Sequence, residues 1–86
     1  MYLHLGNTVS VPWEDIVAIF DLDNASTAKD TRTFLREAEK QGMVIAVGTE
    51  LPKSLVVCCP PGSWQRVYLS PMNPATLLGR IEALKF

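Results

Sequence analysis

Four basic residues at helical spacing are the strongest chemical feature of this sequence. They stand three, four and four residues apart, so on a helix they line a single face, which we call the basic row. Its members are Lys29, Arg32, Arg36 and Lys40. Such a row attracts polyanions such as DNA, and its repetition in an oligomer would add avidity. The alternative interpretation is a solvated helix face, because Glu37 and Glu39 flank the row and weaken its field.

Residue patterns for catalysis or metal binding are weak. The single histidine, His4, has no serine or cysteine nucleophile at a spacing that would bring the two together. A zinc site needs three or four ligands, and more than fifty positions separate His4 from the cysteines at 58–59. Residues 21–24 begin like a calcium loop, but Ser26 replaces the required glycine and Arg32 the final glutamate. We therefore expect no enzyme activity, no metal and no cofactor.

The cysteines and tryptophans are compatible with packing roles. Cys58 and Cys59 are adjacent and would point to opposite faces of a strand, so they cannot form a disulfide of normal geometry with each other. We expect both to be buried as small hydrophobic side chains. Trp13 and Trp64 lie beside prolines in predicted loops, where they either anchor an interface or ligand or cover the edge of the core.

The basic row needs a helix to position it, and the sequence predicts one over about residues 27–41. Thr27 followed by Asp30 fits a capping box, and Gly42 supplies the C-terminal stop. The alternative N-caps are Asn24 and Ser26. A buried stripe is predicted opposite the row, because apolar or neutral residues recur there at three- and four-residue spacing. These residues are Ala28, Thr31, Phe34, Leu35 and Ala38.

The other predicted elements are short. They are an N-terminal hairpin over residues 2–11, a buried strand over 16–20, strands over 43–47, 54–58 and 66–70, and a helix opened by Asn73 and Pro74. The turn at 60–63 makes the last two strands a second hairpin. Together these elements predict a single α+β domain over residues 1–86, with a small mixed or antiparallel sheet, one long helix and one short C-terminal helix.

The predicted strands carry more apolar surface than the helices can cover. Strands 16–20, 43–47 and 54–58 are apolar on both faces, but two helices cover roughly one face of a small sheet. The second face then needs a partner, and a second copy of the chain is the simplest one, so we expect a homo-oligomer. The alternative is that the N-terminal hairpin folds across that face.

The composition limits the class of protein. At 86 residues, with 48% hydrophobic and 20% charged, the chain is an ordinary globular domain and neither a multidomain enzyme nor a disordered chain. A net charge of −1 means that nucleic-acid binding needs local clustering of basic residues. The longest wholly apolar runs are five residues, against roughly 20 for a membrane span. The N-terminus lacks a secretory pattern, so we expect a cytoplasmic location and no membrane partner.

A series of short motifs runs through roughly residues 1 to 80 in a characteristic order. They are HLG at 4–6, IVAIFD at 16–21, FL at 34–35, GMVI at 42–45, ELPKSLVVC at 50–58, YLSP at 68–71 and ATLL at 75–78. In this order they resemble the extracellular matrix regulatory protein family, and within it most closely the RemB branch. The resemblance implies a small bacterial cytoplasmic protein of the spore-forming Firmicutes and their relatives that influences biofilm-matrix gene expression.

The resemblance also implies a mode of action. Members of the RemA branch form closed rings that bind promoter DNA through repeated basic residues, in the manner of LytTR-type domains arranged around a circle. The basic positions of that branch fall here near Asp15 and near Glu50 and Leu51, and only Lys53 is positive there. No family DNA residue therefore transfers directly. Our own candidates for DNA contacts are Lys29, Arg32, Arg36, Lys40, Lys53 and Arg66.

Two functions follow as hypotheses. The first is a ring-forming, non-enzymatic regulator that binds double-stranded DNA through phosphate contacts from the basic row and Lys53. The alternative is an oligomeric protein-interaction module of the same family that has lost direct DNA binding. That module would hold a protein partner through Trp13, Trp64 or the C-terminal helix.

Overall fold

The computed structural model describes residues 1–23 and 28–84, so the expected helix caps Asn24, Ser26 and Thr27 lie outside the described residues. The predicted α+β architecture is confirmed. In chain order the elements are β1 (Tyr2–Gly6), β2 (Val9–Pro12), the 3-10 turn η1 (Trp13–Asp15), β3 (Ile16–Asp21), α1 (Ala28–Lys40), β4 (Val44–Ala46), β5 (Ser54–Cys58), β6 (Arg66–Ser70) and α2 (Pro74–Leu84).

Four of the strands form one mixed sheet in the order β3-β5-β6-β4. β5 is antiparallel to both β3 and β6, whereas β4 runs parallel to β6. The parallel pair arises because α1 carries the chain across the sheet between β3 and β4. β1 and β2 form a separate antiparallel hairpin, as predicted.

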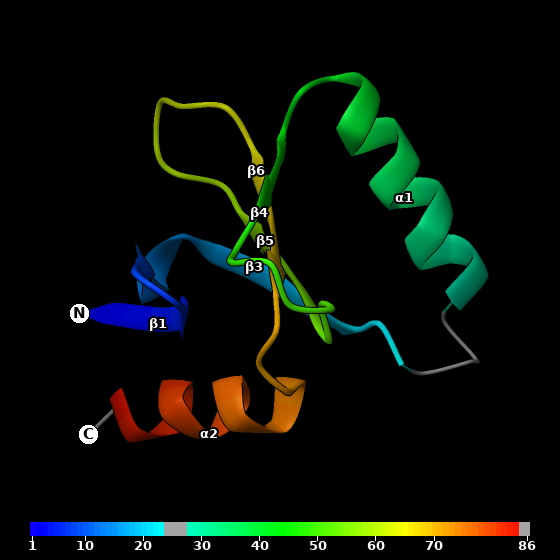
Figure 1. The fold of residues 1–86 in the computed structure, drawn as a ribbon. Coiled ribbons are helices and arrows are strands. Elements are labelled where there is room, and N and C mark those ends of the chain that lie inside the picture. Colours follow the sequence, from blue (N-terminus) through cyan, green and yellow to red (C-terminus); the bar gives the residue numbers. More distant parts are fainter. Residues whose placement is uncertain (24–27, 85–86) are drawn as a thin grey trace.

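The sheet is covered on both faces by the chain itself (Figure 1). On one face α1 packs against the sheet through Ala38, with Leu55 and Val57 of β5 beneath it. On the other face the β1–β2 hairpin and α2 bury Leu3 and Leu77 against a second core cluster. All five residues of β5 are buried because this strand lies between the two layers.

The expectation that the second face of the sheet needs a partner chain was therefore wrong. That expectation counted only the two helices as elements that cover the sheet and did not count the hairpin. Leu3, Leu5 and Val11 of the hairpin are almost fully buried and join the core on that face. The alternative, in which the N-terminal hairpin folds across the second face, is confirmed.

Two helix ends follow their predicted local signals. α1 ends in a Schellman motif, in which Gly42 has a φ of 70° and Met43 N–H donates to Ala38 C=O at 3.0 Å. At the start of α2, the Asn73 side-chain oxygen accepts a hydrogen bond from Ala75 N–H at 2.8 Å, and Pro74 takes the first helical position. Within the described residues neither helix is long and apolar enough to cross a membrane.

Candidate nucleic-acid interface

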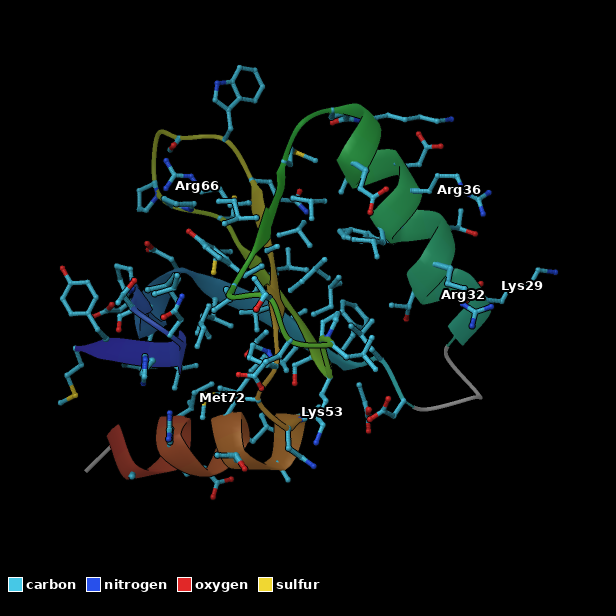
Figure 2. All side chains as sticks on the ribbon, in the orientation of Figure 1. Lys29, Arg32, Arg36, Lys53, Arg66 and Met72 are labelled. Atoms are coloured by element: carbon cyan, nitrogen blue, oxygen red, sulfur yellow. The ribbon has the colours of Figure 1, made fainter. Side chains whose placement is uncertain are left out.

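The basic row lies on the face of α1 that points away from the sheet. Thr31 and Ala38 are buried on the opposite side of the helix, and Phe34 is half-buried beside them. All four side chains of the row are exposed. Figure 2 shows Lys29, Arg32 and Arg36 projecting from the outer side of α1. From its first to its last residue the row spans about 16 Å along the helix axis.

Acidic residues of α1 reduce the positive charge of the basic row, and the reduction differs along the helix. α1 carries three acidic residues beside the four basic ones, namely Asp30, Glu37 and Glu39. Lys40 Nζ lies 3.6 Å from a Glu37 carboxylate oxygen, and both side chains are more than half exposed. Such an exposed pair is worth little to stability, but it partly neutralises the charge of Lys40. Among the described residues neither Arg32 nor Arg36 takes part in an ion pair, so these two arginines form the electropositive centre of the row.

Lys53 and Arg66 do not join the basic row. Lys53 precedes β5, and its N–H donates to Ser70 C=O at 2.8 Å. Arg66 opens β6 opposite Cys58. Because β5 and β6 are antiparallel, Lys53 and Arg66 lie at opposite ends of this strand pair, and Figure 2 shows both apart from the outer side of α1. The structure thus isolates the basic row as a patch of its own.

The two tryptophans have different environments. Trp13 lies in η1, half-buried, and its backbone N–H donates to Met1 C=O at 3.1 Å, so it helps close the edge of the hairpin layer. Trp64 lies in the loop between β5 and β6 and is 85% exposed. Of the two alternatives left open for these residues, packing fits Trp13 and a surface role fits Trp64.

The other candidate chemical groups take local structural positions. His4 Nε2 lies 2.8 Å from the Asn7 carbonyl oxygen, across the turn of the N-terminal hairpin. Cys58 is buried as predicted, but Cys59 is exposed, because β5 ends at Cys58 and the chain leaves the sheet there. Within residues 1–23 and 28–84, no group of three or more His, Cys, Asp or Glu side chains could hold a metal ion.

Sequence reasoning missed the exposed apolar edge of the sheet. The run at 16–20 was predicted as a buried strand, but β3 is an edge strand whose Val17 is 67% exposed and Phe20 36% exposed. At the opposite edge, Ile45 of β4 is 38% exposed. A run that is apolar at every position gives no signal that separates an edge strand from a central one.

Comparisons with known proteins cover nearly the whole chain. A family model described as RemA-like, extracellular matrix regulatory protein A-like, matches residues 2–81. Over 82 residues the chain is 35% identical to Extracellular matrix regulatory protein B of Bacillus subtilis (strain 168). That alignment covers 95% of this chain and 91% of the relative. Both matches include the hairpin, the four-stranded sheet and α1.

Proposed function

Because the chain belongs to the extracellular matrix regulatory protein family, we propose that it is a non-enzymatic regulator of biofilm-matrix gene expression that binds duplex DNA through the basic row. The observation that carries this proposal is the row itself. Four exposed cations line the outer face of α1, while the opposite face of the same helix is fixed to the sheet. The cations are therefore presented on a rigid support.

The dimensions of the row suit a phosphate backbone. Duplex DNA carries one negative charge per roughly 1.7 Å of axis, so a row of about 16 Å faces several phosphates at once. Phosphate contacts set register and orientation but do not read sequence. We therefore assign affinity to the basic row and do not assign it base recognition.

A single copy of the row gives only weak affinity for DNA. We propose that self-association into a ring raises this affinity by presenting several copies of the row to one duplex. Support comes from the two ends of the sheet, since within the described residues neither the outer edge of β3 nor that of β4 is paired. Each edge exposes an apolar side chain, Val17 on β3 and Ile45 on β4. Contacts between two different edges are head-to-tail, and such contacts generate rings when the rotation closes.

Charge reversal on α1 tests the DNA-binding proposal. The double variant Arg32→Glu, Arg36→Glu should lose retention of a labelled AT-rich duplex at low salt, while the oligomer, measured by sedimentation, stays intact. The matched control is Lys53→Glu, Arg66→Glu, which changes the net charge by the same amount away from the row. Equal losses in both variants would mean that retention depends on overall charge or on contacts from Lys53 and Arg66, and not on the basic row alone.

The second candidate is the protein-interaction module, and the exposure of Trp64 is the observation that favours it. A largely exposed tryptophan is a common anchor of protein interfaces. If the module is correct, the wild-type chain does not retain the duplex even at low salt. A partner protein is then held in a way that Trp64→Ala abolishes and reversal of Arg32 and Arg36 leaves unchanged.

A further inference from the structure

A cleft of about 450 Å³ opens where the α1–β4 turn meets the β5–β6 loop. Residues 41–43 and Ile45 line one side, and residues 63–66 line the other. Its volume falls in the range of pockets that hold small organic ligands, roughly 300–1,000 Å³. The only residue it shares with the DNA candidates is Arg66, which lies outside the basic row.

Backbone hydrogen bonds fix both sides of the cleft in advance. On the first side, the Schellman motif at Gly42 ends α1, and Met43 C=O accepts a hydrogen bond from Val67 N–H at 2.9 Å. On the second side, Ser63 N–H donates to Pro60 C=O at 3.2 Å. Gly62, at the third position of that turn, has a φ of 69°, as a type II turn requires. A ligand would therefore meet a preformed shape and would not have to order two loops.

The side chains around the cleft combine an aromatic face with cationic and amide groups. Trp64 is 85% exposed, so its indole is free to stack against a flat ring. Arg66 brings a guanidinium group, which suits a phosphate because it can donate two parallel hydrogen bonds. Gln41 and Gln65 each bring a donor and an acceptor in one side chain. None of the described residues that line the cleft carries a carboxylate.

We propose that this cleft binds an adenine nucleotide. The adenine ring would stack on Trp64, the amide of Gln41 or Gln65 would pair with its N6 and N7 edge, and Arg66 would bind the phosphate. Glutamine is one of the two residues whose amide matches that adenine edge, and stacking on tryptophan adds affinity for a flat base. An acidic peptide would also satisfy Arg66, and its backbone would pair with the amides, but without an aromatic side chain it would leave the indole face of Trp64 without a flat partner.

Nuclear magnetic resonance with adenosine monophosphate as the probe tests the proposal. Titration of the isotope-labelled chain should give saturable shifts at residues 41–45 and 63–66, including the Trp64 indole N–H, but not at the Trp13 indole. Adenosine and inorganic phosphate should each bind about tenfold more weakly than the nucleotide, since each lacks one of the two recognition elements. Shifts confined to residues 29–40, or none at millimolar nucleotide, would overturn the proposal.

Substitutions inside and outside the cleft distinguish specific binding from nonspecific association with the surface. Trp64→Ala should weaken nucleotide binding by about tenfold or more, and Arg66→Ala by a similar factor. Leu51→Ala is the matched control, because Leu51 is also 85% exposed but lies outside the cleft. Equal binding by Trp64→Ala and Leu51→Ala would contradict the assignment. Saturable binding of single-stranded oligonucleotides without binding of the mononucleotide would also contradict it, because the cleft would then serve a polymer.

The cleft shares Ile45 with the β4 edge of the proposed ring contact, but the residues that would hold the nucleotide lie outside β4, so the nucleotide site and the DNA-binding proposal fail independently. The variant Arg32→Glu, Arg36→Glu should keep full nucleotide affinity, because both arginines lie outside the cleft. If the wild-type chain binds nucleotide but no duplex, only the DNA proposal fails. If it binds duplex and no nucleotide, only the cleft assignment fails.

Discussion

Cys58 and Cys59 are neighbours in sequence, but only Cys58 lies in the core. Burial raises the pKa of the Cys58 thiol from its ordinary value of 9.0 to about 11. The negative charge of Asp15 contributes a smaller part of this rise, and Arg66 opposes it. The neutral thiol is therefore the form that the folded chain favours.

The raised pKa predicts a loss of stability at high pH. Below pH 9 the Cys58 thiol is protonated in both the folded and the unfolded chain, so the free energy of unfolding has no contribution from its titration. Between pH 9 and 11 the unfolded chain releases this proton first, and the free energy of unfolding should fall by about 2 kcal/mol. Urea unfolding at several pH values across this range measures the fall in the free energy of unfolding. Cys58→Ala, although less stable overall, should show a shallower fall, and identical slopes would contradict the assignment.

Two buried serines join the layers of the fold. Ser70 Oγ donates to the Leu5 carbonyl of the hairpin and accepts a hydrogen bond from Met72 N–H at 3.1 Å. Ser54 Oγ donates to the Met72 carbonyl ahead of α2. Both serines are fully buried, so these bonds link the hairpin and the approach to α2 directly to β5 and β6.

Removal of the Ser70 hydroxyl should therefore be costly. Ser70→Ala leaves the Leu5 carbonyl and the Met72 N–H without this partner, and it should lower the free energy of unfolding by about 1–3 kcal/mol. Ser10→Ala, at an exposed position of β2, should change it by less than about 0.5 kcal/mol. Thermal and urea unfolding of the two variants give the comparison. Equal stabilities would show that Ser70 does not join the layers.

At the scale of elements, the end of α1 depends on one backbone conformation. Gly42 has a φ of 70°, and a side chain added there would meet no atom of the described residues within 4 Å. Gly42→Ala should therefore cost only the backbone strain, about 1 kcal/mol. Gly79 lies inside α2 with equally open space, and Gly79→Ala should stabilise by about 0.5–1 kcal/mol. In urea unfolding, the two substitutions should change the free energy of unfolding in opposite directions. A stabilising Gly42→Ala would contradict the Schellman assignment.

The elements differ in how far their sequence predicts them. The end of α1 was predicted within a residue, because its apolar stripe and Gly42 are local signals, whereas the predicted start at Thr27 lies outside the described residues. The cap of α2 at Asn73 was predicted for the same reason. The position of β3 at an edge, and hence the exposure of Val17, was not predicted, because strand order depends on pairing between residues far apart in sequence. The cleft beside Trp64 was missed for the same reason, since two distant loops build it.

At the scale of the whole molecule, the motif resemblance located the family, which the comparisons confirm over residues 2–81. The prediction that one face of the sheet needs a partner chain was wrong, because composition does not reveal that the hairpin and α2 share that face. The proposed self-association therefore rests on the outer edges of β3 and β4, neither of which is paired within residues 1–23 and 28–84, and no longer on an uncovered face.

The edge-to-edge assembly predicts a variant that breaks it. Val17→Lys places a charge on the exposed edge of β3 and should convert the oligomer to single protomers in sedimentation velocity. Leu51→Lys is the control, because Leu51 is more exposed than Val17 but lies in the loop between β4 and β5. A wild-type chain that sediments as a single protomer at every concentration would rule out the ring.

The central claim is that the basic row binds DNA phosphates, and the salt dependence of binding tests it most directly. Fluorescence anisotropy of a labelled AT-rich duplex should show that the logarithm of the binding constant falls linearly with the logarithm of salt concentration. Four phosphate contacts from one copy give an expected slope of about −3.6, and each further copy of an oligomer on the same duplex makes the slope steeper. Arg32→Glu, Arg36→Glu should remove binding and Lys53→Glu, Arg66→Glu should largely keep it. No binding by the wild-type oligomer at low salt would contradict the account.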